Sequence, residues 1–295
     1  MMPRYDRRLL RARFAAAADR YDEVAVLQHE VESRLLESAL SLQPEPQRIV
    51  DVGCGPGRAL SMLRQRYRRG SVLGIDLALP MLRRARKAGG FWRSLPVACA
   101  DACALPLPDG SVDLLFSSLC LQWVDDLPAA LDEFRRVLRP GGRLLLATFG
   151  PDTLLELREA WAAAGRMAQV SSFPGIAVLG DLVMAQGFRD PVLDRDLFTL
   201  SYAAVDDLVG ELRAIGANNA RSDRPRGLAG RQAWQAMREH YGLRRDEDGR
   251  LPATYEVIYV QARAPQAGQP RRSAAGEIAT IPVSAIQRRP PRPAG

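Results

Sequence analysis

A glycine-rich turn between an apolar strand and a helix constrains this chain more than any other feature. The turn is the segment 51–57 (DVGCGPG), and it follows the apolar pair Ile49-Val50. Glycine tolerates the dihedral angles of a tight turn and lets a ligand approach the main chain, while the helix that follows presents its amide dipole. The next apolar segment, 71–75, ends on Asp76, roughly 20 positions beyond the glycines, where a carboxylate can accept hydrogen bonds from ribose hydroxyls. The pattern predicts a βαβ unit that binds a nucleotide-like cofactor.

The glycine spacing distinguishes between two classes of ribose-bearing cofactor. A dinucleotide site has a third glycine three positions after the second, and here that position is Arg58. The chain instead has G-x-G-x-G behind Asp51, a carboxylate that suits a ligand with an ammonium and a sulfonium in place of phosphates. We therefore expect S-adenosylmethionine as the cofactor; an ordinary turn with chance glycines is the alternative.

Length and composition predict one domain with insertions. The chain has 295 residues, 47% of them hydrophobic, which is enough to bury one sizeable core. No apolar run approaches the roughly 20 residues that span a bilayer, and the first residues lack the apolar core of a signal peptide. We expect a cytoplasmic protein that needs neither a membrane nor nucleic acid.

The charge is unevenly distributed along the chain. Residues 1–220 carry 27 basic and 27 acidic side chains, whereas residues 221–295 carry 14 and 7, so the net charge of +7 is entirely C-terminal. Such a region can steer an acidic partner, although a merely solvated face is the alternative. The four cysteines, Cys54, Cys99, Cys103 and Cys120, lack metal-site spacing, so we expect small buried thiols and no metal.

Strands and helices alternate from residue 48 onward, which predicts a doubly wound α/β fold with a mostly parallel sheet. The expected strands are 48–53, 71–76, 96–100, 112–117, 143–149 and an antiparallel last strand at 255–260. The expected helices are 9–40 with a break near Asp22, 57–68, 80–88, 126–138, 153–164, 180–186, 205–215 and 232–241, with an apolar stretch at 192–200. These elements divide the chain into an N-terminal helical lid (1–43), a methyltransferase-like domain (44–262) with an Arg-rich helical insertion (217–250), and a mostly disordered tail (263–295), of which 277–286 could clip onto the domain.

Ligands of open α/β sheets bind at the carboxyl ends of the strands, so the site is expected in the loops that follow them. The loop after the third strand contains Asp101, which can accept from the amine of adenine or simply cap a helix. The expected cofactor-binding residues are Asp51, Gly53, Gly55, Asp76, Leu77, Asp101, Ala102, Ser117 and Gln122.

Those loops contain no evident general base, because His29, His240 and Lys87 lie outside them. Methyl transfer to a carboxylate needs none, since a carboxylate is already ionised at neutral pH. The sequence thus favours an acid as the methyl acceptor over an amine or a phenol.

Seven segments together resemble the malonyl-acyl-carrier-protein O-methyltransferases of biotin synthesis, a family with the class I S-adenosylmethionine-dependent methyltransferase fold. They are 14–22 (FAAAADRYD), 27–28 (LQ), 51–57 (DVGCGPG), 121–127 (LQWVDDL), 148–154 (TFGPDTL), 215–219 (IGANN) and 251–256 (LPATYE). The resemblance covers roughly residues 9–262, and the 121–127 and 148–154 strings are its most discriminating parts. The family's His-Asp pair is replaced here by Ala177-Val178.

The resemblance implies that the free carboxylate of a malonyl thioester, on acyl carrier protein or coenzyme A, is methylated. Hiding this charge lets fatty-acid synthesis elongate the group towards a pimeloyl thioester. An acidic carrier protein as partner would give the C-terminal arginines a purpose, and the candidates are Arg221, Arg224, Arg226 and Arg231.

Three other functions are compatible with the sequence. The first is assistance to respiratory complex I assembly by arginine hydroxylation. The methyltransferase-fold proteins with this function share the Leu-Gln-Trp and Pro-Ala-Thr-Tyr strings. The others are a small-molecule methyltransferase and a cofactor-binding scaffold that acts only through partners.

The N-terminal segment is expected to form a lid over the site. Phe14, Tyr21 and Gln28 are spaced by seven residues and so share one helical face, with Tyr21 positioning the substrate; plain packing on the sheet is the alternative. An arginine is also expected to hold the other carbonyls of the substrate, with Arg158 and Arg135 as candidates.

Overall fold

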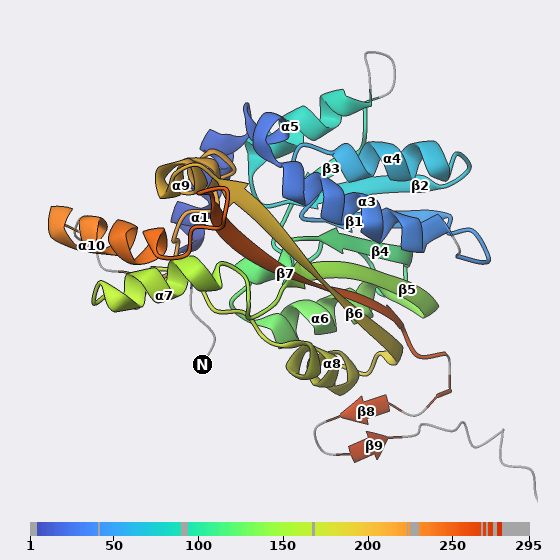
Figure 1. The fold of residues 1–295 in the computed structure, drawn as a ribbon. Helices are drawn as coiled ribbons and strands as arrows, with labels where there is room; N and C mark the ends of the chain where they lie inside the picture. Colours follow the sequence, from blue (N-terminus) through green and yellow to red (C-terminus); the bar gives the residue numbers. More distant parts are fainter. Residues whose placement is uncertain are drawn as a thin grey trace, which may run out of the picture.

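The computed structural model describes residues 5–40, 42–89, 94–166, 169–222, 224, 230–266, 268–269, 271–273 and 276–278. A seven-stranded sheet with the order β3-β2-β1-β4-β5-β7-β6 lies at its centre (Figure 1). Its strands are β1 (Arg48–Val52), β2 (Ser71–Asp76), β3 (Val97–Cys99), β4 (Val112–Ser118), β5 (Leu138–Phe149), β6 (Arg189–Tyr202) and β7 (Leu251–Arg263). The helices are α1 (Arg7–Ala17), α2 (Tyr21–Val24), α3 (Val26–Leu40), α4 (Arg58–Arg66), α5 (Leu79–Ala88), η1 (Leu121–Trp123), α6 (Leu127–Val137), α7 (Leu155–Ala163), α8 (Ile176–Ala185), α9 (Val205–Ala214) and α10 (Arg231–Gly242). A separate hairpin contains β8 (Arg271–Ser273) and β9 (Gly276–Ile278).

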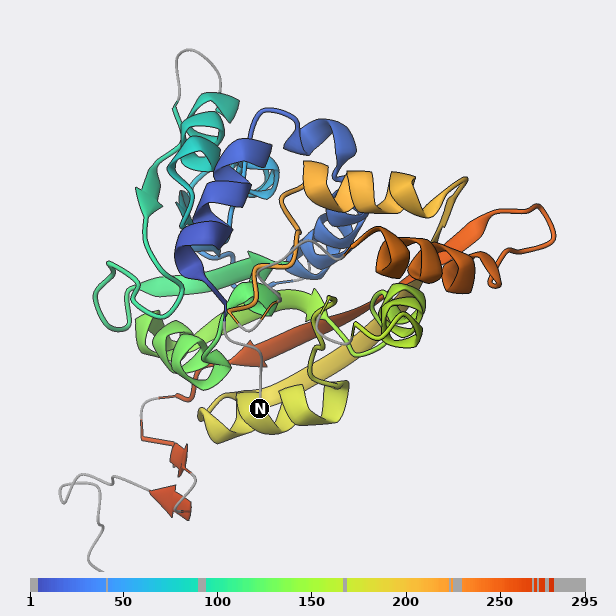
Figure 2. The same ribbon diagram turned by 90° about the vertical axis from the view of Figure 1, so that its left-hand side faces the viewer.

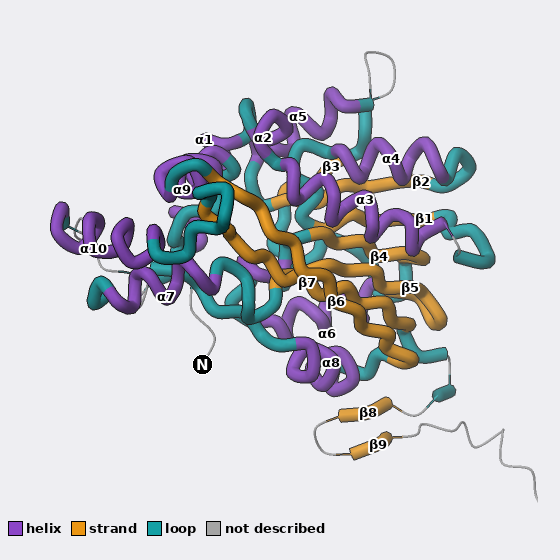
Figure 3. Tube along the Cα trace, viewed as in Figure 1, coloured by secondary structure: helices purple, strands orange, loops and turns teal. Residues whose placement is uncertain are grey.

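The strand directions confirm the predicted fold class. Strands β1 to β5 pair in parallel, and β7 pairs antiparallel with both of its neighbours, β5 and β6. Figure 3 shows the strands of this sheet, in orange, side by side. The chain builds the sheet outward from β1 to β3 and then returns to add β4 on the other side of β1. Such a reversal opens a crevice at the carboxyl ends of β1 and β4, and a ligand site is expected there.

The core has two layers because successive strand residues point to opposite faces of the sheet. In β1, Ile49 packs with the face covered by α3, α4 and α7, whereas Val50 packs with the face covered by α6 and α8. Figure 1 shows α6 and α8 on one side of the sheet and α3 and α4 on the other.

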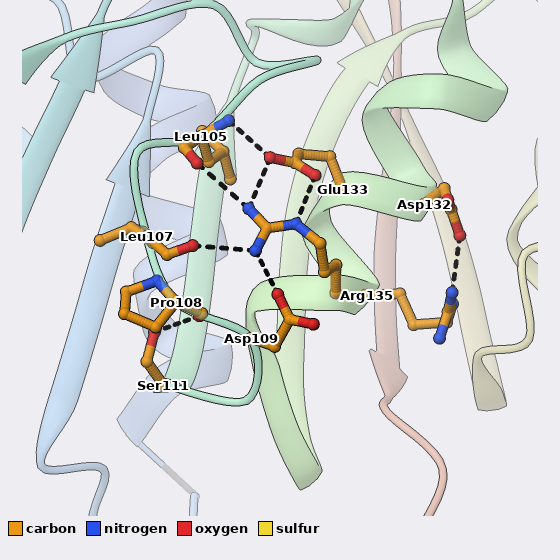
Figure 4. A network of polar contacts seen from close by, with 9 residues as sticks. Leu105, Leu107, Pro108, Asp109, Ser111, Asp132, Glu133 and Arg135 are labelled. Carbon is orange, nitrogen blue, oxygen red and sulfur yellow. Dashed lines mark hydrogen bonds and ion pairs between the residues drawn. The ribbon is translucent and has the colours of Figure 1, made fainter.

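A polar network fixes the loop between β3 and β4 to α6 (Figure 4). The Leu105 amide donates to Glu133 at 2.6 Å, and the Arg136 guanidinium donates to the Leu107 carbonyl at 2.9 Å and pairs with Asp109 at 2.6 Å. The loop that begins at the end of β3 is therefore anchored at its far end.

Several local predictions need correction. The segment 9–40, expected as a helix with one break near Asp22, has two breaks on either side of this residue and forms three helices. The chain turns at 18–20, where Ala17 and Ala18 pack against Ala78 and Met81, and again at residue 25. The stretch 192–200 forms most of the edge strand β6.

Helix α8 begins at Ile176 and not at the expected Gly180, which lies within the helix. A Cβ at Gly180 would make only ordinary van der Waals contact with Leu193 of β6, at 3.6 Å, so packing does not require glycine here. Cys99 is exposed at the end of the short edge strand β3, contrary to the expectation of a buried thiol.

Most of the C-terminal tail lies outside the described residues, as does the part of 277–286 beyond Ile278. The proposed division into lid, domain and tail stays a prediction. In the part of the chain that the structure describes, no helix is long and apolar enough to cross a membrane.

Candidate active site

The glycine turn lies where β1 ends, held against the end of β2. The amides of Gly53 and Cys54 donate to the Ile75 carbonyl at 2.7 and 3.0 Å. Gly53 has a φ of +79°, and a Cβ there would lie 2.5 Å from the Cβ of Cys120. No side chain fits at this position, so the main chain of the turn is available to a ligand.

A cavity, here called the donor cavity, opens above this turn. Six of the expected cofactor residues line it: Gly53, Gly55, Asp76, Leu77, Asp101 and Ala102. Helix α1 closes its other side with Arg7, Leu10, Arg11 and Phe14. Figure 2 shows α1, in dark blue, beside α5.

Asp76 braces the turn from the end of β2. Its Oδ2 accepts a hydrogen bond from the Gly55 amide at 3.0 Å, and its Oδ1 accepts from the Ala78 amide at 2.7 Å. Burial raises the pKa of this carboxyl group, and the amide donors oppose that rise. The side chain is thus fixed in place with lone pairs still available to hydroxyl groups in the cavity.

Asp51 is buried without a complete set of partners. Its side chain is 2% exposed, and its Oδ2 has no hydrogen-bond partner among the described residues. Burial raises its pKa well above the ordinary value, and the negative charges of Glu32 and Asp76 raise it further. An unpaired buried carboxyl group beside other carboxylates is costly for the free protein and is relieved by a bound cation. This environment fits a cofactor that carries ammonium and sulfonium charges.

Arg58 occupies the position at which a dinucleotide site has its third glycine. Its guanidinium pairs with Glu32 of α3 at 2.6 Å and donates to the Ser33 hydroxyl at 3.0 Å. The first turn of α4 is therefore tied to the N-terminal helices. This contact replaces a phosphate site with a structural ion pair.

Asp101 has a partner from α1. Its Oδ2 pairs with Arg7 of α1 at 2.7 Å, while its Oδ1 accepts from the Cys103 amide at 2.9 Å. The Arg7 side chain is 56% exposed, so the pair is screened by solvent and can open for a ligand.

Three expected cofactor residues do not line the donor cavity, and one of them is the buried Asp51 described above. Ser117 is fully buried and donates to the Val52 carbonyl at 2.8 Å, linking β4 to β1, and its neighbour Ser118 lines the cavity instead. Gln122 donates to the Leu119 carbonyl at 2.6 Å and lines a second cavity.

This second cavity, here called the acceptor cavity, has a volume of about 480 Å³. It is largely apolar, with aromatic side chains from several elements: Phe149, Trp161, Phe173, Trp234 and Tyr255. Four residues line both cavities and form a shared wall: Phe14, Tyr21, Leu119 and Trp123. A group bound in one cavity is therefore adjacent to a group bound in the other.

The N-terminal helices form much of the shared wall. Phe14 packs edge-on against Trp123, with ring centroids 5.5 Å apart and planes at 82°. Although Phe14, Tyr21 and Gln28 belong to three different helices, all three line the acceptor cavity. Burial raises the pKa of the Tyr21 hydroxyl, and the nearby carboxylates raise it further, so this hydroxyl is a donor at neutral pH.

Neither arginine expected to hold the substrate lines a cavity. Arg158 donates to the carbonyls of Pro151 and Thr153, and Arg135 pairs with Asp132 on α6. The acceptor cavity is lined instead by Arg13, Arg213 and Arg224. The only signal for Arg13 in the sequence was its position next to Phe14 on the expected lid.

The candidate partner arginines that the structure describes differ in exposure, since Arg221 and Arg224 are half-buried. Arg221 forms a β-bridge with Tyr5, and Arg224 donates to the Arg221 carbonyl at 2.8 Å. Arg231 is exposed at the start of α10, and Arg226 lies outside the described residues.

The side chains available for chemistry are few. Among the described residues that line the two cavities, none is histidine or lysine. No cluster of three or more metal-ligating side chains occurs in the described ranges. The geometry suits a reaction that needs positioning of two groups rather than a general base.

Comparisons with known proteins point the same way. Residues 50–146 match the family model described as "Methyltransferase domain". Malonyl-acyl-carrier-protein O-methyltransferases of Xylella fastidiosa and Halorhodospira halophila are each 46% identical to this chain, with 96% of both chains covered in each case. The solved YcgJ protein of Bacillus subtilis has the same fold, with a TM-score of 0.57 at 16% identity over 81% of this chain and 99% of its own.

Proposed function

Because this chain belongs to the malonyl-acyl-carrier-protein O-methyltransferase family, we propose that it methylates the free carboxylate of a malonyl thioester carried by acyl carrier protein. The methyl donor is S-adenosylmethionine. Esterification removes the negative charge, so the group can be elongated as a primer towards a pimeloyl thioester for biotin. The 46% identity over 96% of both chains is the observation that carries this proposal.

The site supports the proposal through two adjacent cavities of different character. The donor cavity is lined by Asp76, Asp101 and Asp125, whereas the acceptor cavity is largely apolar and has three arginines but no acidic residue in its described lining. Of the alternatives, the complex I assembly function has no support in the two relatives described above, since both are named as O-methyltransferases.

The chain's own residues would act mainly by binding and positioning. S-adenosylmethionine supplies a methyl group activated by its bond to a sulfonium. Asp76 would hold the ribose hydroxyls, and the unpaired Asp51 would hold the cationic part of the ligand. Tyr21, Phe14 and Trp123 would exclude water and hold the acceptor against the donor, and such positioning is a large source of rate enhancement.

A transfer assay tests this function directly. Purified protein with methyl-labelled S-adenosylmethionine and malonyl-acyl carrier protein should give a base-labile methyl ester. Acetyl-acyl carrier protein, which has no free carboxylate, is the matched control and should remain unlabelled. Malonyl-coenzyme A in a parallel reaction measures the preference between the two carriers. A protein that binds the donor but labels no malonyl thioester would contradict the proposal.

Tyr21 is proposed to donate a hydrogen bond to the reacting carboxylate at the boundary of the cavities. Tyr21→Phe should lower kcat/KM by about tenfold, mainly through a higher KM for the acceptor, because a hydrogen bond to a charged group contributes about 1.5 kcal/mol or more. The affinity for S-adenosylhomocysteine should change little. Unchanged turnover together with unchanged acceptor affinity would refute the polar role of this residue.

The partner and the compartment also follow from this function. We propose that the chain acts in the cytoplasm without lipid or nucleic acid, so full activity of the purified protein without either would be expected.

We keep Arg221, Arg224, Arg226 and Arg231 as candidates for contact with an acidic carrier protein. A steep rise with salt in the KM for the acylated carrier would support such a surface.

A further inference from the structure

One arginine in the acceptor cavity has a buried nitrogen without a partner. Arg13 belongs to α1 and lines this cavity. Its Nη1 is buried and makes no hydrogen bond to any described residue. A buried donor of a charged group that lacks an acceptor is costly unless a ligand supplies one.

The surroundings of Arg13 favour an anionic ligand. The described lining of the acceptor cavity includes Arg13, Arg213 and Arg224 but no aspartate or glutamate. Burial lowers the pKa of Arg13, the positive charge of Arg224 lowers it further and the negative charge of Asp6 opposes this, and a guanidinium remains charged at neutral pH. The described lining of the acceptor cavity therefore carries the positive charges of its arginines and no negative charge to balance them.

The two other arginines of the lining differ from Arg13, because one has partners and the other is exposed. Arg224 donates to the Arg221 carbonyl at 2.8 Å and lies 4.0 Å from Asp6. Arg213 is exposed to solvent at the end of α9. Arg13 is the arginine best placed to meet a buried carboxylate.

The backbone of Arg13 is fixed close to the boundary between the cavities. A Cβ on Gly216, whose φ is +78°, would lie 3.2 Å from the Arg13 carbonyl oxygen, so α1 packs tightly on this loop. The next residue, Phe14, lines both cavities. A carboxylate held by Arg13 is thus near the wall at which the donor and the acceptor meet.

We propose that Arg13 binds the free carboxylate of the malonyl group and makes the acceptor cavity selective for the acid over its methyl ester. This inference rests on the proposed function. In the reaction a carboxylate oxygen forms the new O–C bond, the C–S bond breaks with its electron pair kept by sulfur, and no proton moves. The ester that results is neutral, so it loses the charge that Arg13 binds, and the product is released in preference to the substrate.

Equilibrium binding of two carrier-free probes tests this role. The probes are malonyl-pantetheine and the methyl ester of malonyl-pantetheine, titrated by calorimetry into protein saturated with S-adenosylhomocysteine, so that no turnover occurs. The wild-type protein should bind the acid at least about tenfold more tightly than the ester. Arg13→Gln should weaken binding of the acid about 10- to 100-fold and leave the ester unchanged, so that the preference disappears.

Two further variants separate charge from folding. Arg8→Gln is the matched control, because Arg8 is an exposed residue of the same helix that lines neither cavity, and it should keep the full preference. Arg13→Lys keeps the charge and should retain part of the preference; it also serves if the glutamine variant does not fold. Thermal melting and S-adenosylhomocysteine affinity report on folding.

The inference is overturned if Arg13→Gln weakens the acid and the ester equally, because Arg13 would then hold a part that both probes share. It is also overturned if the variant leaves both affinities unchanged. Either result for the variant is compatible with a wild-type protein that methylates malonyl-acyl carrier protein. Failure of this inference is therefore distinguishable from failure of the proposed function.

Discussion

Replacing Asp76 by asparagine should weaken S-adenosylhomocysteine binding by about 100-fold or more. Both carboxylate oxygens accept backbone amides in the structure, from Gly55 and Ala78. An asparagine would place its own NH₂ group against one of these donors, so the glycine turn would lose a brace. The substitution would also remove a carboxylate oxygen that can accept a hydrogen bond from the ribose hydroxyls. Two hydrogen bonds to a charged group at about 1.5 kcal/mol each correspond to about 100-fold in affinity.

Calorimetry on the purified protein measures this effect. Asp109→Asn is the matched control, because Asp109 is 81% exposed and pairs with Arg136 on the far side of the β3–β4 loop. The control should bind like the wild type. If Asp76→Asn binds within a few-fold of the wild type, the ribose site has been assigned to the wrong residue. If the wild type itself gives no heat with the donor or its demethylated product, the cofactor assignment fails.

Replacing Gly57 by alanine should destabilise the fold by about 3 kcal/mol or more. The residue has a φ of +92°, and an added Cβ would lie 2.7 Å from the Ala85 Cα and 2.8 Å from its Cβ in α5. A left-handed backbone costs a residue with a side chain about 1–2 kcal/mol, and overpacking adds about 1–3 kcal/mol. A melting temperature about 10 °C below that of the wild type is expected, measured by circular dichroism.

The matched control for this prediction is Gly165→Ala. Gly165 also has a positive φ, +74°, but nothing lies within 4 Å of a Cβ added there. The control should show only the conformational part, about 1–2 kcal/mol. Equal losses in the two variants would show that the contact with α5 contributes nothing. The expected difference would establish Gly57 as the glycine that allows α4 and α5 to approach each other.

The cofactor crevice was largely predictable because its chemistry lies in a short stretch of sequence. Gly53, Gly55 and Asp76 are separated by one βαβ unit, and the hydrogen bonds between the turn and the end of β2 follow from that local geometry. The same reasoning was less successful for Ser117 and Gln122. Ser117 lies within β4 and Gln122 follows it, but which way their side chains point depends on β1 and β5, which the local pattern does not specify.

The acceptor cavity was hardly predictable, because its walls come from segments far apart in the chain. Arg13, Gln122, Trp161 and Tyr255 meet only after the sheet and its helices have assembled. Spacing alone could not select the arginine that binds the substrate, and the two candidates, Arg158 and Arg135, have partners elsewhere in the structure. No periodicity distinguishes an arginine that points into a cavity from one that points into solvent.

The sequence by itself determined the fold class, the cofactor class and the family, because a glycine turn, an acid one strand later and alternating strands and helices are local patterns with a fixed geometric meaning. Only the tertiary structure decided which side chains share a cavity. It showed that Asp51 is buried without a full set of partners, that the N-terminal segment bends twice to close over the site, and that Arg13 reaches the acceptor cavity. Burial and the pairing of charges are properties of the whole packed chain, so they cannot be read from neighbours in sequence.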